Sequence, residues 1–442
     1  MKKFLLSFVT MAVVLTGCGG GGSEPTSSEP ASELQNDTEP TTEAEVKLDS
    51  PVEIDFWHAM SGGHEESLQA IVEEFNANSE FITVKAVNQG SYDDLQQKIM
   101  AAAKAKGLPA ISQVTTNVVP EYIANDFITP LDSYMNHETN GMSDEEVSDI
   151  VDIFKESSTW DGTMYSIPFS KSTRILYYNS GLLEEHSLDV PKTWEDVRTI
   201  AETVTKDGVV GMGFENSFEM EFESILRQMG GEYVDEAALE AKFASEKGIA
   251  ALQLIKDMVV EGIARTAGED GYMSNPFGRG DVAMYIGSSA GIPHVRGAAE
   301  GNIEWSATVL PTYEGVAATP FAGNDIVMYN QSSEEEQLAA WEFMKYLIST
   351  DVTAQWAQDS GYLPVRYSAM ELDSYRAFIE EFPEHGAGEQ QFDAGYFSAR
   401  VAGGNAVRNI ILEELENIML DRKTVEEGLQ SAEDQANDVL KK

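Results

Sequence analysis

The order of apolar and polar positions predicts alternating strands and helices in the first third of the chain. Apolar and acidic side chains alternate through residues 52–57, which is the period of a strand with one buried face. Helical spacing of apolar residues follows in 65–76, a second strand-like run in 82–87, and another helical run in 92–106. This order predicts an α/β lobe on a largely parallel sheet, with ligands bound where loops leave the carboxyl ends of the strands.

Further helices are predicted along the rest of the chain. One begins after Thr193, whose hydroxyl can cap the backbone N–H of Asp196. Residues 267–325 are instead rich in glycine and in strand-like runs. A chain of 442 residues is too long for one ordinary core, so two lobes or domains are expected. Helical spacing of apolar residues also marks four segments: 246–261, 334–348, 407–417 and 424–440.

The first fifty residues have the pattern of an exported protein. A basic start precedes an apolar run over 4–15 that is too short to span a bilayer, so it indicates a secretory signal. Residues 19–50 contain eight acidic residues and one lysine among Gly, Ser, Thr and Pro. Because such a segment cannot bury an apolar core, it predicts a disordered acidic spacer.

Charge and composition exclude several classes of partner. The chain has 75 Asp+Glu against 29 Lys+Arg, a formal net charge of -46, which repels nucleic-acid phosphates and anionic headgroups. Its single cysteine rules out an internal disulfide and a cysteine-based zinc or iron–sulfur site. The six histidines are scattered, and nucleotide-binding and calcium-loop motifs are absent from the sequence. Neither a metal nor a cofactor is expected.

One motif raises the alternative of a secreted serine hydrolase. Residues 287–291 read G-x-S-x-G around Ser289, after a predicted strand at 282–286, which is the setting of a nucleophile elbow. A triad in hydrolase order needs a downstream histidine. His294 is too close in sequence, and His385 lies in a glycine-rich segment. The same serines also suit a binding protein, because hydroxyls and N–H groups at a helix N-terminus attract an anion.

Seven stretches, in this order, carry a resemblance over residues 51–442: VEIDFWHAMSGGHEESLQAIVEEFNAN, LPAISQV, YSIPFSKSTRILYYNSGLL, VPKTWEDV, GRGDVAMYIGSSAG, SGYLPVR and KTVEEGLQSAEDQANDVLKK. They resemble family 1 of the extracellular solute-binding proteins, the ligand receptors of ABC importers. The segments 56–58, 90–92 and 404–408 are similar to the sn-glycerol-3-phosphate-binding subgroup in particular.

The resemblance implies a two-lobed α/β fold of the periplasmic-binding-protein type II, with three crossings between lobes that close over a ligand in the cleft. It places lobe one at 51–169 with 324–372, and lobe two at 170–323 with 373–442. It also implies a monomeric receptor without catalytic residues, which passes a small-molecule solute to the membrane permease subunits of the importer.

The segment Leu15-Thr16-Gly17-Cys18 resembles the lipobox of bacterial lipoproteins. This implies that the signal peptide 1–17 is removed and that a lipid on Cys18 anchors the chain to the outer face of the cytoplasmic membrane. Residues 18–50 would then form a flexible tether, which holds the receptor at high effective concentration near its permease. A plain signal peptide with an unrelated cysteine is the alternative.

The subgroup also implies a set of ligand-contacting positions. The planar guanidinium of Arg408 suits a bidentate grip on phosphate, although a salt bridge to Glu413 or Glu414 is the alternative. Gly323 would let the backbone approach a ligand, or would form an ordinary strand-end turn. The two tyrosines present ring faces and hydroxyls, or are half-buried core aromatics. The carried-over positions are Tyr92, Ser172, Ser289, Gly323, Tyr362 and Arg408.

Two departures from the subgroup add two candidates. Where the subgroup has a glutamate for glycerol hydroxyls after LPAISQV, this chain has Thr116 and its neighbours, and two phenylalanines, including Phe214, replace a tryptophan pair. Lys171 and Arg174 are expected to add positive charge that favours an anion. The expected ligand is a phosphorylated polyol of the sn-glycerol-3-phosphate or glycerophosphodiester type, and the alternative is a neutral sugar or oligosaccharide.

Overall fold

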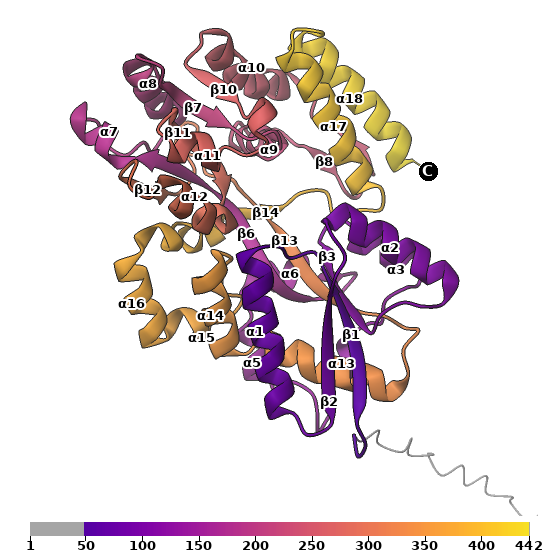
Figure 1. Cartoon of the computed structure of the whole chain (residues 1–442). Coiled ribbons are helices and arrows are strands. Elements are labelled where there is room, and N and C mark those ends of the chain that lie inside the picture. Colours follow the sequence, from indigo (N-terminus) through magenta and orange to yellow (C-terminus); the bar gives the residue numbers. More distant parts are fainter. Residues whose placement is uncertain (1–47, 442) are drawn as a thin grey trace, which may run out of the picture. The chain divides into compact units, whose positions relative to one another are not determined.

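The computed structural model describes residues 48–441, which belong to one compact unit, Val46–Lys442 (Figure 1). The predicted signal peptide, Cys18 and nearly all of the predicted spacer lie outside the described residues. Within 48–441, no helix is both long enough and apolar enough to cross a bilayer.

Ten strands form one large sheet: β1 (Val52–His58), β2 (Ile82–Asn88), β3 (Ile111–Thr115), β6 (Ile167–Asn179), β7 (Val210–Phe214), β10 (Ala264–Thr266), β11 (Val282–Ser288), β12 (Trp305–Thr308), β13 (Thr319–Met328) and β14 (Gly395–Phe397). Their order is β10-β7-β11-β6-β13-β3-β1-β2, with β12 beside β6 and β14 beside β13. Two small hairpins lie apart from it: β4 (Thr159–Trp160) with β5 (Thr163–Met164), and β8 (Val234–Asp235) with β9 (Glu240–Ala241).

The long strands β6 and β13 join the two halves of this sheet. They pair antiparallel with each other, while β3, β1 and β2 lie on one side and β11, β7 and β10 on the other. Strand β1 pairs in parallel with β2 and with β3, and β7 pairs in parallel with β10 and β11. Strand β6 is buried over its first eleven residues because both of its faces are covered.

The helices cover both halves of the sheet (Figure 1). The α-helices are α1 (Gly63–Asn78), α2 (Tyr92–Ala105), α3 (Val119–Ala124), α4 (Asp132–Met135), α5 (Asp144–Ser148), α6 (Asp152–Ser157), α7 (Ser180–Glu185), α8 (Trp194–Val204), α9 (Glu219–Gln228), α10 (Glu246–Val260), α11 (Ser274–Gly278), α12 (Ile292–Ala299), α13 (Glu334–Leu347), α14 (Thr350–Ser360), α15 (Tyr367–Glu371), α16 (Asp373–Glu381), α17 (Gly404–Met419) and α18 (Val425–Leu440). Short 3-10 turns are η1 (Gly268–Asp270), η2 (Ser289–Gly291), η3 (Pro383–Ala387) and η4 (Glu389–Ala394).

The periodic segments are confirmed, with small shifts at their ends. Each predicted strand and helix has a counterpart, and Thr193 Oγ1 accepts a hydrogen bond from the Asp196 backbone N–H at 3.1 Å, as expected of the cap of α8. Helix α17 starts at Gly404, three residues before its predicted start. Residues 267–325 contain the expected strands and also the helices α11 and α12. These helices are too short to show a clear apolar period in the sequence.

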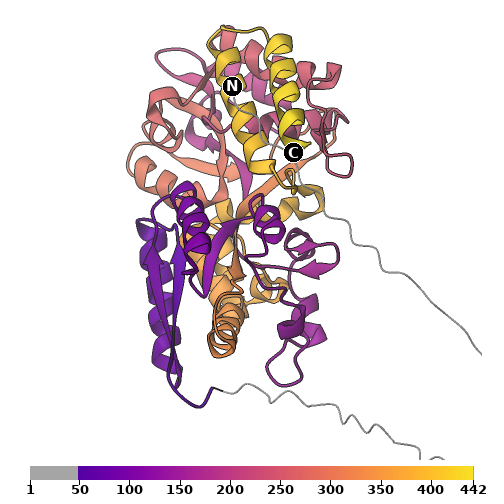
Figure 2. The ribbon, with the colours of Figure 1, turned by 90° about the vertical axis from the view of Figure 1, so that its right-hand side faces the viewer.

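Each half of the sheet has its own hydrophobic core. One core packs β1, α1 and α13 through side chains such as Phe56 and Trp341. The other packs α9, α10 and α17 through side chains such as Phe222, Leu252 and Ile411. Figure 2 shows indigo, purple and orange elements in the lower half, and mainly pink and yellow elements in the upper half. Two separate cores allow the halves to act as distinct structural bodies.

Candidate ligand-binding site

A cavity of about 290 Å³ lies between the two halves. One half contributes α2, β3, the start of α3 and the middle of β13, and the other contributes α9, residues 397–399 and the N-terminal turns of α17. The carboxyl end of β3 lines this cavity, and the carboxyl ends of parallel strands are where a ligand is expected. Four of the predicted site residues line the cavity: Tyr92, Thr116, Gly323 and Arg408.

The other four predicted residues lie outside the cavity lining. Phe214 is fully buried in the core behind α9. Ser289 is 1% exposed, and its Oγ accepts a hydrogen bond from the Thr173 backbone N–H at 3.3 Å. Ser172 is also buried, on β6 opposite β13. Tyr362 stands next to the site rather than in it, through its contact with Tyr92.

The two predicted tyrosines are brought together from distant parts of the chain. Tyr92 opens α2, and its hydroxyl accepts a hydrogen bond from Asn324 Nδ2 at 2.7 Å. The Tyr92 and Tyr362 hydroxyls are also hydrogen-bonded to each other, and burial raises the pKa of both. The Tyr362 ring stacks on Trp356 with centroids 5.8 Å apart. Tyr362 therefore supports the orientation of Tyr92 in the cavity wall.

Gly323 is required by the close approach of the two long strands. Its φ is +104°, and a Cβ at this position would lie 1.9 Å from the Ser170 carbonyl oxygen of β6. The position lies inside β13, next to an irregularity in pairing between Asn324 and Asp325, and not at a strand-end turn. Glycine thus lets β6 and β13 cross tightly directly beside the cavity.

Arg408 projects from α17 with 45% of its side chain exposed. Its Nε lies 2.9 Å from Oε1 of Glu219, which begins α9. The alternative partners suggested by the sequence were wrong, because Glu414 bonds Lys423 instead, at 2.7 Å, and no described contact joins Arg408 to Glu413. The ion pair of Arg408 is made across 189 residues of sequence, which local charge patterns do not reveal.

The positive charge of Lys171, which was expected to favour an anion, is paired inside the protein. Lys171 is fully buried and forms an ion pair with Asp325 of β13, which is equally buried. Burial lowers the pKa of Lys171, while Asp325 opposes that shift. Lys171 is absent from the cavity lining, although its Nζ donates a hydrogen bond at 3.3 Å to Oγ1 of Thr116, which is in the lining; its effect on an anion stays a prediction.

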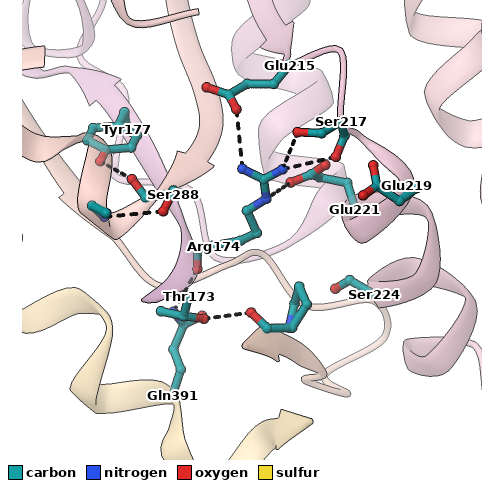
Figure 3. A network of polar contacts seen from close by, with 12 residues as sticks. Thr173, Arg174, Tyr177, Glu215, Ser217, Glu219, Glu221, Ser224, Ser288 and Gln391 are labelled. Atoms are coloured by element: carbon teal, nitrogen blue, oxygen red, sulfur yellow. Dashed lines mark hydrogen bonds and ion pairs between the residues drawn. The ribbon is translucent and has the colours of Figure 1, made fainter. Parts of the chain in front are cut away.

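The charge of Arg174 is also neutralised (Figure 3). Its Nε lies 2.9 Å from Glu221 and its Nη1 3.3 Å from Glu215, while Nη2 donates to the Ser217 carbonyl oxygen at 3.0 Å and to its Oγ at 2.9 Å. Burial raises the pKa of Glu221 to about 7, although Arg174 opposes the shift. Arg174 therefore holds the loop before α9 and, like Lys171, does not line the cavity.

Acidic side chains outnumber basic ones in the described cavity wall. Asp93, Glu219 and Glu223 line it, whereas Arg408 is its basic residue. Glu223 lies 2.7 Å from Nη2 of Arg227, and burial raises the pKa of both buried glutamates against the effect of their arginine partners. These acids were not among the residues predicted for the site. Their signal is the four-residue spacing of Glu219 and Glu223, which places both on one face of α9.

Three amide side chains bridge the two halves at the cavity wall. Asn117 Nδ2 donates to Asn405 Oδ1 at 3.2 Å, and Asn405 Nδ2 donates to Gln96 Oε1 at 3.4 Å. Asn405 lies at the start of α17, and its partners belong to α2 and to the loop before α3. All three line the cavity. The two halves are therefore in direct polar contact around the cavity.

The described residues do not form the catalytic triad that a serine hydrolase would need. No hydrogen bond joins Ser289 to a histidine there. The His294 ring packs instead against His64, with centroids 5.7 Å apart, and His385 contacts Arg296 at 3.2 Å. Residues 48–441 also bring together no group of three or more His, Cys, Asp and Glu that could hold a metal ion.

Two α/β halves that both line one cavity define a receptor for small molecules. The chain belongs to the bacterial extracellular solute-binding protein family, whose model matches residues 70–381. A curated relative, the sn-glycerol-3-phosphate-binding periplasmic protein UgpB of Rhizobium meliloti (strain 1021), is 26% identical over 412 residues, covering 87% of this chain and 93% of the relative.

Solved structures share the fold. UgpB from Mycobacterium tuberculosis, in complex with glycerophosphocholine, is 23% identical with a TM-score of 0.77, over 89% of this chain and 99% of that one. The GacH receptor of Streptomyces glaucescens GLA.O, solved unliganded and with acarbose, is 24% identical with a TM-score of 0.77, over 88% and 98%. The predicted two-lobed α/β fold is confirmed. The chain is a solute-binding protein of an ABC importer, and its family and its curated relative are described as binding proteins.

Proposed function

We propose that this protein is a lipid-anchored receptor that captures a phosphorylated polyol and delivers it to the permease of its importer. The observation that carries the proposal is Arg408 in the cavity wall. Its Nε is paired with Glu219, whereas Nη1 and Nη2 make no hydrogen bond to any described residue. Those two nitrogens present parallel donors, which suit the bidentate geometry of a phosphate. The glycerol-phosphate and glycerophosphocholine named for two relatives support the same ligand class.

The proposed receptor closes its lobes over the ligand. Lobe one is 51–169 with 324–372 and lobe two is 170–323 with 373–442, joined by β6, β13 and the chain after α15. The contacts of Asn405 with both amides of the other half support closure as part of binding. The anchor belongs to the same proposal: Cys18→Ala should release the protein from the membrane fraction of cells that export it, while retention there would contradict a lipid on Cys18.

A neutral sugar or oligosaccharide is the second candidate. It is favoured by the excess of carboxylates over cations in the cavity wall and by the tyrosine rings of Tyr122 and Tyr233. Carboxylates accept hydrogen bonds from sugar hydroxyls, and aromatic rings pack on sugar faces. The GacH receptor, solved with acarbose, has the same fold.

Calorimetric titration of the purified protein separates the two candidates. The ligands are sn-glycerol-3-phosphate, glycerophosphocholine and maltose, each tested at the same ionic strength because charge interactions are screened by salt. We expect saturable binding of at least one of the two glycerophosphates. Binding of maltose together with no binding of either phosphate would reject the phosphorylated polyol and favour the sugar.

A further inference from the structure

Glu219 presents an unsatisfied acceptor in the cavity wall. The residue is 5% exposed, and its Oε1 accepts the hydrogen bond from Arg408 Nε. Its Oε2 is buried and accepts no hydrogen bond from another residue of the described chain. Buried polar atoms in folded proteins are nearly always bonded, and an unbonded carboxylate oxygen is especially unfavourable. The position of Glu219 in the cavity lining makes a ligand the natural source of the missing donor.

Gln113 presents the complementary donor from the other half. It lies on β3 with 1% exposure, and its Oε1 accepts a hydrogen bond from the Ala59 backbone N–H at 3.0 Å. A backbone N–H can only donate, so this bond fixes which end of the amide is oxygen. The Nε2 is left without a partner among residues 48–441, and Gln113 lines the same cavity as Glu219.

Their position in the cavity lining distinguishes Glu219 Oε2 and Gln113 Nε2 from the other buried polar atoms that have no hydrogen-bond partner among the described residues. The remaining ones in the described chain belong to residues outside the cavity lining, such as Trp160, Tyr346 and Tyr396. The two that do line the cavity are one acceptor and one donor, on α9 and on β3. A hydroxyl group can donate to the first and accept from the second.

We propose that Glu219 Oε2 and Gln113 Nε2 recognise the hydroxyl groups of the ligand, next to the phosphate held by Arg408. This inference rests on the proposed function and specifies which part of the polyol each wall binds. A phosphate cannot lie on Glu219 because two anions repel each other in a buried site. Glu219 would thus replace, from the opposite half, the hydroxyl-accepting glutamate whose place after β3 is taken here by Thr116 and its neighbours.

A ligand-side comparison tests this assignment. sn-Glycerol-3-phosphate and n-propyl phosphate carry the same phosphate, but the second has no hydroxyl groups, so the ratio of their dissociation constants cancels most of the general effect of charge. The wild-type protein should prefer glycerol phosphate by about tenfold or more, the value of one charge-assisted hydrogen bond. Glu219→Ala should lower that ratio by about tenfold, and Gln113→Ala should lower it by a smaller factor.

Matched variants keep the test decisive. Glu219→Gln keeps the size and shape of the side chain, so this variant is expected to fold. It should lower the ratio of the two dissociation constants by at least about threefold, because an amide oxygen is a weaker acceptor than a carboxylate. Glu414→Gln removes another buried carboxylate, on α17 outside the cavity, and should leave the ratio unchanged. Arg408→Ala should weaken both ligands and leave their ratio within about threefold of its wild-type value.

The outcomes separate the two levels of the proposal. If the wild-type protein binds neither phosphate, the proposed function fails and this assignment fails with it. If it binds glycerol phosphate but the ratio is unchanged in both Glu219 variants, phosphate recognition stands and the role of Glu219 is rejected. A ratio that falls in the Glu219 variants and not in Glu414→Gln supports the assignment.

Discussion

Replacing Arg408 by alanine should weaken a phosphorylated ligand through two effects. The first is loss of the guanidinium donors. The second arises from Glu219, whose carboxylate would keep its charge with no partner at 2.9 Å and would repel the phosphate. Truncating one partner of a buried charge pair costs about 2 to 5 kcal/mol. Because the Arg408 side chain is 45% exposed, the lower part of that range applies, about 2 to 3 kcal/mol or 30- to 150-fold in Kd.

A double substitution separates the two effects. In Arg408→Ala with Glu219→Ala the repelling carboxylate is also removed, so n-propyl phosphate, which lacks hydroxyls, should bind more tightly than to Arg408→Ala alone. The assay is calorimetric titration of the four proteins at one ionic strength, after confirming equal folded fractions by circular dichroism. Arg408→Lys should also be harmful, because an ammonium group lacks the planar pair of donors. A change of less than threefold in the Kd of a phosphorylated ligand in Arg408→Ala would show that Arg408 does not hold the phosphate.

Three further predictions concern stability and motion. Lys171→Met should lower the free energy of unfolding by about 3 to 5 kcal/mol in a denaturant titration, because it leaves the buried Asp325 charge unpaired. Adding Asp325→Leu should restore most of this stability. Equal losses in the single and double variants would contradict the prediction. Burial and nearby Arg296 lower the pKa of His385 to about 4 from 6.5, so the unfolded chain takes up a proton at higher pH than the folded one. The free energy of unfolding should therefore fall by about 2 to 3 kcal/mol between pH 6.5 and pH 4. An identical pH dependence in His385→Gln would argue against this. Small-angle scattering should show a smaller radius of gyration in saturating ligand, and an unchanged radius would count against lobe closure.

The sequence predicted the fold well because its elements are strongly periodic. Strand β1 alternates apolar and acidic residues, α8 has its cap at Thr193, and α10 and α13 repeat apolar residues at helical spacing. These features are local, so they are readable without the tertiary structure. Helix α11 was not predicted, because five residues give too few apolar repeats, whereas the helix expected after the Ser289 motif is present as α12.

The site was only partly predictable because its electrostatics are set by distant residues. The positive charge expected from Lys171 is paired with Asp325, which lies 154 residues further along the chain. Glu219 and Gln113 were missed because their free atoms become apparent only when α9 and β3 face one cavity. Phe214 was expected at the ligand from the family resemblance, yet its side chain lies in the core.

A crystal structure of the protein with sn-glycerol-3-phosphate tests the central claim most directly. The lobes should be closed, with ligand density in the cavity between α9 and β3 and phosphate oxygens about 3 Å from Nη1 and Nη2 of Arg408. Density for the ligand away from Arg408, or an empty cavity in crystals grown at saturating ligand, would contradict it.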